Sequence, residues 1–331
     1  MENFEAIFFI SVGSDFGLGH WRRMQSVAKI LEKQQFCISF KFFLFGTTGH
    51  QFVNFENLLK VSSVTCIENI NEINALEYSK NHIVIIDLHP SHIDSDIEIY
   101  SKYIKLKNSL IIAIDHAAVN TNISSDIRWV PSFYKNPQWP QNLNIECGWT
   151  TYLLDKKLDT EPLPETNSLL VLTGGSDTQK LGNIWPFLID RYIDKALEIK
   201  WVKGPFASYP TIPKQSKHNF TIYDAPRGID DLINKSDWVL TVYGVSVFES
   251  LMYGRTCIVF NPYSDQNKLE MDAFENENIV YFARDDKAII DSLKFCVSNS
   301  SKVLNYEKGY PIIDGLGAQR LVELIKRVMR H

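Results

Sequence analysis

The chain has 331 residues, 45% of them hydrophobic and 22% charged, and this length exceeds what one hydrophobic core usually organises, so we expect about two domains. Its net charge of -5 provides no global attraction to nucleic acid or to an anionic membrane surface, which argues against both as partners. Its five cysteines include no close pair, so the sequence suggests neither a disulfide framework nor a zinc site and fits a cytoplasmic protein.

The first predicted element is an apolar strand at residues 6–12 that leads into a glycine-rich turn and a helix. The turn contains Gly13, Gly17 and Gly19, and His20 follows it directly. Amides at a helix N-terminus can receive an anion, and glycines let the backbone approach a ligand closely, so Gly17 and Gly19 are candidate binding residues. The glycine spacing fits neither the dinucleotide-binding fingerprint nor the P-loop, which argues against an oxidoreductase and a P-loop kinase.

His20 is the candidate catalytic residue of this turn. An imidazole at the carboxyl edge of the first strand can take a proton from water or from a hydroxyl group near neutral pH. The alternative interpretation is a histidine that only caps the turn, or that contacts a phosphate without proton transfer.

Further apolar runs alternate with polar or helical stretches, which is the rhythm of a parallel sheet in an α/β protein. These runs are residues 38–45, 83–87 and 110–115. Two of them end in an aspartate, Asp87 and Asp115, and His89 lies close behind the first. Because open α/β sheets bind ligands at the carboxyl ends of their strands, these three side chains are candidates for a sugar pocket.

The same stretch contains side chains of the kind that hold a divalent metal, namely Asp87, His89, His92, Asp94 and Asp96. No later segment completes the pattern of a binuclear phosphoesterase site. A loop at the end of a strand is the simpler interpretation, so we predict neither a metal nor a cofactor.

The composition changes twice near the middle of the chain. Residues 131–140 are rich in proline, aromatic and amide side chains, whereas residues 155–167 are charged and contain prolines. We place the domain junction in the second stretch, which predicts an N-terminal domain at 1–160 and a C-terminal domain at 161–316.

The C-terminal half begins with another apolar strand and glycine turn. Residues 169–173 lead into Gly174, Gly175 and Ser176, whose amides are candidates for an anionic group. The similarity between the two halves is architectural, because no sequence repeat accompanies it.

A third turn of this kind follows the apolar run at 238–242 and consists of Gly244, Val245 and Ser246. Its amides can receive a diphosphate, and Glu249 can accept two hydrogen bonds from the diol of a ribose. The alternative is that Ser246 and Glu249 form a capping box whose only role is to begin the helix.

Asp265 and Gln266 follow the predicted strand at 257–260 and offer a carboxylate and an amide to a sugar. A polar loop explains this pair equally well.

The last predicted element is a helix within residues 317–331, whose docking partner the sequence leaves open. Its predicted apolar face consists of Leu321, Leu324, Ile325 and Val328.

These motifs resemble the UDP-sugar hydrolase family of pseudaminic acid biosynthesis and the related spore-coat polysaccharide proteins. The matching pieces are Gly17-Leu18-Gly19-His20 with Arg23, Asp115, residues 148–157, Gly174-Gly175-Ser176-Asp177 and residues 314–320. The resemblance implies an α/β protein with the glycosyltransferase B (GT-B) architecture, in which two Rossmann-like domains face a cleft. It also implies that His20 activates water to release UDP and a free sugar without a metal, and that Arg23 lies in the binding region.

The C-terminal half is also similar to the peptidoglycan GlcNAc transferase. In that enzyme a glycine turn binds the UDP diphosphate, a glutamate matching Glu249 holds the ribose, and a glutamine matching Gln266 holds the donor sugar. The sequence departs from the hydrolase pattern at residues 243–246, at Asp87-Leu88-His89 and in the long segment 123–144. These departures fall in the expected sugar and acceptor pocket, so the sugar and the acceptor stay open.

We therefore predict a nucleotide-sugar hydrolase that releases UDP and a free acetamido-deoxy sugar for bacterial surface glycan biosynthesis. The first alternative is an inverting GT-B glycosyltransferase that uses a nucleotide-sugar donor. The second is a non-catalytic nucleotide-sugar-binding protein, and a 2-epimerase of similar architecture fits the C-terminal segment less well. The expected ligand is a small-molecule nucleotide sugar, with no nucleic acid partner and no membrane-spanning segment.

Overall fold

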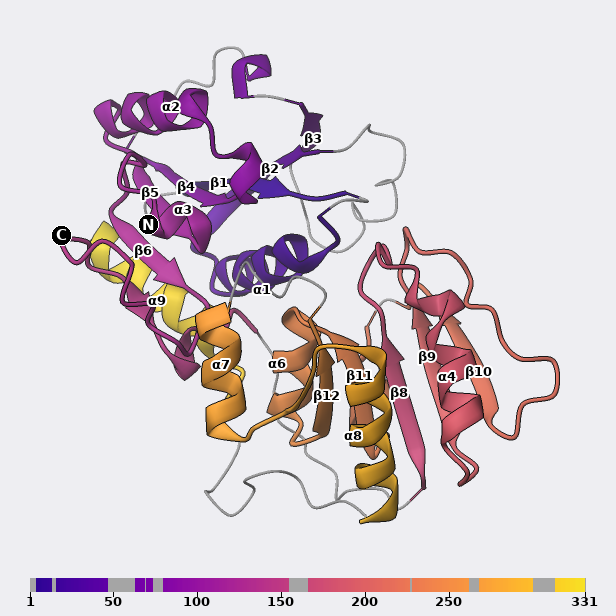
Figure 1. Ribbon diagram of the computed structural model, residues 1–331. Coiled ribbons are helices and arrows are strands. Elements are labelled where there is room, and N and C mark those ends of the chain that lie inside the picture. The colour runs from indigo at the N-terminus through magenta and orange to yellow at the C-terminus, as the bar shows by residue number, and fades with distance from the viewer. Residues whose placement is uncertain are drawn as a thin grey trace. The chain divides into compact units, whose positions relative to one another are not determined.

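The computed structural model describes residues 4–13, 16–46, 63–68, 70–73, 80–154, 166–226, 228–261, 268–299 and 313–330. It divides into two compact units (Figure 1). Unit 1 comprises residues 1–156 together with 315–331, and unit 2 comprises residues 157–314. The C-terminal helix therefore belongs to unit 1, although the chain reaches it only after completing unit 2.

Unit 1 is built on a seven-stranded sheet with the strand order β3-β2-β1-β4-β5-β6-β7. All neighbouring strands pair in parallel. The strands are β1 (Phe4–Ser11), β2 (Cys37–Phe45), β3 (Ser63–Ile67), β4 (His82–Asp87), β5 (Leu110–Ile114), β6 (Ile127–Val130) and β7 (Glu146–Cys147). The helices are α1 (Gly19–Lys33), α2 (Ser95–Leu106), α3 (His116–Val119) and α9 (Gly317–Met329), with short 3-10 turns η3 (Ile70–Glu72), η4 (Pro90–His92) and η5 (Trp149–Thr151).

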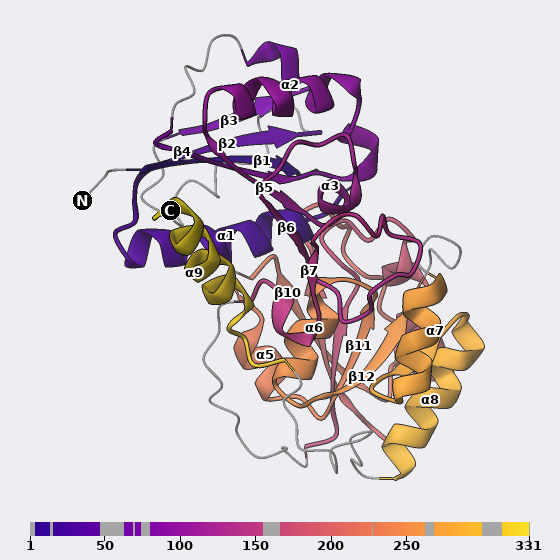
Figure 2. The same ribbon diagram turned by 90° about the vertical axis from the view of Figure 1, so that its left-hand side faces the viewer.

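The central strands of unit 1 are buried on both faces. Strand β5 reads Leu-Ile-Ile-Ala-Ile and all five of its residues are buried. Figure 2 shows the reason, since α1 and α9 cover one face of the sheet and α2 covers the other. A parallel sheet covered on both faces needs apolar side chains on both, so its strands read as continuous hydrophobic runs.

Unit 2 is built on a six-stranded parallel sheet with the strand order β10-β9-β8-β11-β12-β13. Its strands are β8 (Ser168–Leu172), β9 (Glu198–Lys203), β10 (Asn219–Asp224), β11 (Trp238–Val242), β12 (Thr256–Phe260) and β13 (Tyr281–Ala283). Its helices are α4 (Trp185–Tyr192), α5 (Asp230–Asn234), α6 (Val245–Met252), α7 (Lys268–Glu277) and α8 (Asp286–Ser298), with the 3-10 turn η6 (Leu181–Asn183).

The strand order reverses once in each unit, between β1 and β4 in unit 1 and between β8 and β11 in unit 2. Doubly wound sheets bind ligands outside the carboxyl ends of the strands at such a switch point. The two glycine turns singled out in the sequence follow β1 and β8, and the third follows β11. All three therefore lie at a switch point of their own unit.

Helix α9 packs on unit 1 beside α1 and η5. A Cβ atom added to Gly317 would lie 2.0 Å from the carbonyl oxygen of Tyr152, so only glycine permits this close approach. Of the predicted apolar face, Leu321 and Ile325 are buried, whereas Leu324 is partly exposed and Val328 is 38% exposed. The buried side chains of the helix are Ala318, Leu321, Val322 and Ile325.

Within the described ranges, none of the helices combines the length and the apolar character needed to cross a membrane.

Candidate active site

The turn after β1 places His20 at the switch point of unit 1. The amide of Gly17 donates to the carbonyl of Gly13 at 2.7 Å, and Gly17 has a φ of 68°, a conformation that favours glycine. Helix α1 then begins at Gly19 behind Leu18, whose side chain makes no capping hydrogen bond. His20 is therefore the second residue of α1, with a side chain that is 14% exposed.

His20 pairs with Asp87, the last residue of β4. The Nδ1 atom of His20 lies 2.9 Å from Oδ1 of Asp87, whose side chain is completely buried. Burial by itself would raise the pKa of Asp87, but its interactions with Arg23 and His20 outweigh burial and hold the pKa below its ordinary value. An ionised carboxylate only accepts hydrogen bonds, so the contact with Asp87 suits the tautomer of His20 that carries its proton on Nδ1, and in that tautomer Nε2 keeps a lone pair.

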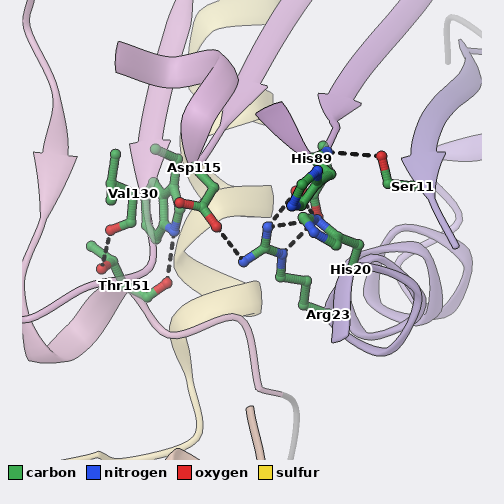
Figure 3. Close-up of polar contacts among 9 residues, drawn as sticks. Ser11, His20, Arg23, His89, Asp115, Val130 and Thr151 are labelled. Atoms are coloured by element: carbon green, nitrogen blue, oxygen red, sulfur yellow. Dashed lines mark hydrogen bonds and ion pairs between the residues drawn. The ribbon is translucent and has the colours of Figure 1, made fainter. Parts of the chain in front are cut away.

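Arg23 lies one turn further along α1 and joins two carboxylates (Figure 3). Its Nε donates to Oδ2 of Asp87 at 2.6 Å, and its Nη1 donates to Oδ2 of Asp115 at 2.9 Å. Its Nη2 donates to Oδ1 of Asp87 and lies 2.9 Å from Nδ1 of His20. Burial would lower the pKa of Arg23, but both aspartates raise it above its usual value.

This arrangement changes two interpretations made from the sequence. Arg23, expected in the binding region, directs all three of its guanidinium nitrogens at protein groups. Asp87, expected to contact a sugar, is fully buried beneath Arg23 and His20. Both residues contact His20.

Asp115 follows β5 in a strained backbone conformation, with φ 56° and ψ -119°. Its amide donates to the carbonyl of Trp129 at 2.9 Å, so the neighbouring strand β6 fixes this conformation. Burial would raise the pKa of the carboxyl group, but Arg23 outweighs it and holds the pKa well below its usual range. The side chain stays 29% exposed, so Asp115 can also reach a ligand.

His89 and His92 form a second layer with Ser11. The Oγ of Ser11 accepts the amide of His89 at 2.7 Å and shares a hydrogen bond with Nδ1 of His92 at 2.7 Å. Burial and nearby histidines lower the pKa of His89. Phe16 lies with its ring centroid 4.9 Å from that of His89 and 4.6 Å from that of His92. The sequence analysis singled out neither Ser11 nor Phe16, although Ser11 ends β1 as Asp87 ends β4.

The possible metal ligands of this region have other partners. Asp87 binds Arg23 and His92 pairs with Ser11, while Asp94 caps α2 by accepting the amides of Asp96 and Ile97. Within the part of the chain that the structure describes, no group of three or more histidine, cysteine, aspartate or glutamate side chains is arranged to hold a metal ion.

In unit 2, the turn after β8 packs tightly against the end of β9. A Cβ atom added to Gly204 would lie 2.3 Å from the carbonyl oxygens of Gly174 and Gly175. The carbonyl of Gly175 also accepts the amide of Phe206 at 2.9 Å. Asp177, the last residue of the Gly-Gly-Ser-Asp motif, has a structural role, since its carboxylate accepts two amides of η6 at 2.8 and 2.9 Å.

Helix α6 begins behind Gly244, which makes no side-chain capping hydrogen bond. Ser246 lies inside the first turn, so the capping-box interpretation of Ser246 and Glu249 is wrong. Val245 and Ser246 are partly exposed, whereas Glu249 is only 5% exposed. Asp265 and Gln266 lie outside the described residues, so the structure does not place them.

Thr173 directly follows β8, next to the strand that leads into α6. It is 4% exposed, and its Oγ1 has no hydrogen-bond partner within the described segments. A buried hydroxyl at this edge can donate to a ligand, and no pattern in the sequence marks Thr173 for that role.

No protein-family model and no curated protein matches this chain. Similar solved structures include MnaA from S. aureus with UDP, with a TM-score of 0.61, 11% identity, and coverage of 99% of this chain and 97% of that one. MurG from Acinetobacter baumannii has a TM-score of 0.54 and 12% identity, and the match covers 98% of this chain and 99% of that one. UGT2 from Phytolacca americana, complexed with UDP-2-fluoro-glucose and pterostilbene, has a TM-score of 0.59 and 10% identity. This match covers 99% of this chain and 100% of that one. At these identities the likeness shows the fold, and the chain has the GT-B fold of two Rossmann-like α/β units.

Proposed function

We propose that this chain is an inverting glycosyltransferase that moves a sugar from a nucleotide-sugar donor to an acceptor hydroxyl, with His20 as the general base. The observation that supports the proposal is the pair of His20 and the buried Asp87 at the switch point of unit 1. With the Nδ1 proton directed at Asp87, Nε2 of His20 serves as the proton acceptor. General-base catalysis by a positioned histidine contributes a factor of roughly 10² to 10⁴.

The proposed reaction is a single displacement. Nε2 of His20 takes the proton of the acceptor hydroxyl as its oxygen forms a bond to the anomeric carbon of the donor. The bond from that carbon to the diphosphate oxygen breaks, and the nucleoside diphosphate leaves with the electron pair. Attack opposite to the leaving group inverts the configuration of that carbon.

The charges around His20 suit this step. Asp87 and Asp115 carry two negative charges against the one positive charge of Arg23, so the cluster has one net negative charge while His20 is neutral. Protonation of His20 makes the cluster neutral overall. Asp87 thus holds the imidazole in the required tautomer and stabilises the imidazolium that the reaction forms.

We assign the nucleotide to unit 2. The first turn of α6, with Gly244, Val245 and Ser246, supplies amides for the diphosphate, and Glu249 binds the ribose. Further contacts to the donor are assigned to Gly174, Gly175, Ser176, the hydroxyl of Thr173, and the pair Asp265 and Gln266. Gly17 and Gly19 let the backbone of unit 1 approach the reacting sugar, and His89 and Asp115 line the pocket around His20.

The main rival is the hydrolase, because the same histidine and aspartate can activate water. The transferase has the better support, since the chain matches over nearly its whole length a UGT2 structure that holds UDP-2-fluoro-glucose together with a second organic molecule, pterostilbene. The resemblance of residues 17–23 and 174–177 to the UDP-sugar hydrolases keeps hydrolysis as the second candidate.

The experiment that separates these reactions is product analysis with a panel of UDP-sugars, with and without sugar acceptors. UDP release that requires an acceptor and yields a glycoside of inverted configuration supports the transferase. Release of UDP and free sugar in equal amounts without an acceptor would show that the protein is a hydrolase and not a transferase. Tight binding without turnover would show that it is a binding protein and neither of these enzymes.

A further inference from the structure

Two aromatic side chains are stacked at the carboxyl edge of the unit 1 sheet, away from His20. Phe133 follows β6 and Trp149 follows β7, with ring centroids 4.4 Å apart and ring planes at 18°. Both side chains are partly exposed. We call this pair the aromatic platform.

The backbone beneath the aromatic platform is tightly braced. The amide of Gly148 donates to the carbonyl of Ser132 at 2.7 Å, which ties the two loops together. Thr151 Oγ1 donates to the carbonyl of Val130 at 2.7 Å, and Nε1 of Trp129 donates to the carbonyl of Thr151 at 2.7 Å. Because this backbone is already ordered, a ligand that binds to the platform loses little binding free energy to ordering the protein.

The aromatic platform lies in line with the proposed catalytic residues. Strand β6 pairs with β5, which ends at Asp115, and β7 pairs with β6. Figure 3 shows Val130 and Thr151 on one side of Asp115 and Arg23 and His20 on the other. With neighbouring strands about 4.8 Å apart, the two to three strand spacings from β4 to β6 and β7 amount to roughly 10–14 Å. A ring on the platform is therefore not the ring whose hydroxyl faces His20.

The segment around the platform is polar and carries no net charge. Residues 131–145 contain five asparagines and glutamines and a single charged side chain, Lys135. Gln138, Asn142 and Asn144 are exposed in this segment. Glu146 directly after it is also exposed, and Nη1 of Arg320 donates to the carbonyl of Thr150, the neighbour of Trp149, at 3.3 Å. Aromatic faces suit the apolar face of a sugar ring, and amide side chains suit its hydroxyl groups. Lys135 and Glu146 have opposite charges, so residues 131–146 carry no net charge that would attract an anionic glycan.

We propose that the aromatic platform is an acceptor subsite for a neutral glycan of at least two sugar rings. One ring stacks on Trp149 and Phe133 while the hydroxyl of another ring reaches Nε2 of His20. This proposal rests on the proposed transferase function, and it names the substrate class on the acceptor side.

The test uses the full-length protein on a printed array of neutral and anionic mono-, di- and tetrasaccharides. Wild type should bind neutral glycans of two or more rings in preference to single sugars. Trp149→Leu should weaken that binding about tenfold, because a stacked ring is lost, whereas Trp149→Phe should retain most of it. The matched control is Tyr103→Leu, which removes an aromatic ring that is 42% exposed on α2, outside the platform.

A second measurement covers the case in which Trp149→Leu does not fold. Wild type and Trp149→Phe are each titrated with the neutral glycan that binds best, and both should bind it. Tryptophan fluorescence should be quenched in wild type but not in Trp149→Phe. The proposal is overturned by preference for anionic glycans, by no neutral glycan binding, or by equal loss in Trp149→Leu and Tyr103→Leu.

UDP release from UDP-sugars, measured with the same variants, keeps the two proposals apart. Neutral glycan binding through Trp149 without any UDP release would remove the transferase function and leave the aromatic platform as a glycan site. Glycosyl transfer that is equally fast in wild type and Trp149→Leu with every acceptor would remove the platform and leave the transferase.

Discussion

At the scale of single residues, the site separates the proposed general base from the groups that hold it. His20 presents Nε2, whereas Asp87 and Arg23 are buried and contact His20 and each other. Buried charges of this kind are stable only when they are paired, so removal of one partner is expected to disturb the fold as well as the reaction. Replacement of His20 is therefore the cleaner test of catalysis.

His20→Ala should reduce turnover of the nucleotide sugar by roughly 10² to 10⁴, since the general base is lost, while UDP affinity stays nearly unchanged. The matched control is His82→Ala, a partly buried histidine at the opposite end of β4 that should leave turnover intact. Steady-state kinetics and calorimetric UDP titration give the two quantities. Turnover retained in His20→Ala would defeat the assignment.

Asp115 should make the stability of the fold depend on pH in acid. Burial opposes ionisation, but Arg23 holds the pKa of Asp115 well below its usual range, so the folded state binds the proton more weakly than the unfolded chain does. The stabilisation is complete above the unfolded pKa of about 4 and is lost as the pH falls toward the folded pKa. The unfolding free energy of wild type should thus exceed that of Asp115→Asn by more at about pH 6 than at about pH 3.

Urea unfolding of both proteins at the two pH values measures this difference. A gap that stays constant, or that widens in acid, would show that the charge of Asp115 does not stabilise the fold through Arg23.

At the scale of elements, the sequence predicts the central strands of unit 1, namely β1, β2, β4 and β5, and misses β3, β6 and β7. β1, β4 and β5 read as unbroken apolar runs because helices cover both faces of the sheet. Strand β3 lies at the sheet edge with a mixed burial pattern, and β7 has only two residues, so neither leaves a clear pattern. Local patterns report burial, and an edge strand has little of it.

The residue partners inside the site are also beyond local patterns. The sequence marks His20, Asp87 and Asp115 separately, each by its place after a strand. Arg23 can join the two aspartates only because β1, β4 and β5 lie side by side. In the sequence, Asp87 is 64 positions and Asp115 is 92 positions away from Arg23. Arg23 therefore reads as a ligand contact from the sequence and as a clamp on two carboxylates in the structure.

Gly317→Ala should destabilise unit 1 by about 1–3 kcal/mol, even though alanine is the better helix former by about 1 kcal/mol. The added Cβ would lie 2.0 Å from the carbonyl oxygen of Tyr152, so α9 must shift away from its seat. Gln319→Ala, on the exposed side of the same helix, is the control and should change stability by less than about 0.5 kcal/mol. Thermal unfolding compares them, and a Gly317→Ala protein as stable as wild type would show that α9 is not held this closely.

At the scale of the whole molecule, the two sheets have the same order of strands but different residues at their switch points. The switch point of unit 1 holds the histidine and its charged partners, whereas the switch point of unit 2 holds glycine turns, the hydroxyl of Thr173 and the first turn of α6. The sequence predicted two Rossmann-like halves and left the docking of the last helix open. The structure places α9 in unit 1.

This division predicts that a nucleotide stabilises unit 2 selectively. UDP at about 100 times its Kd should stabilise the unit that binds it by about 2.7 kcal/mol, which slows hydrogen exchange through unfolding about 100-fold. The slowed amides should lie in β8, β11 and β12, while those of β1 and β4 change little. Gly244→Asp is the matched variant, because a Cβ there meets nothing within 4 Å, so the side chain fits while its charge repels the diphosphate. Hydrogen exchange measured by mass spectrometry should show this protection in wild type and no protection in Gly244→Asp. Protection confined to unit 1, or protection that persists in Gly244→Asp, would show that the nucleotide binds elsewhere.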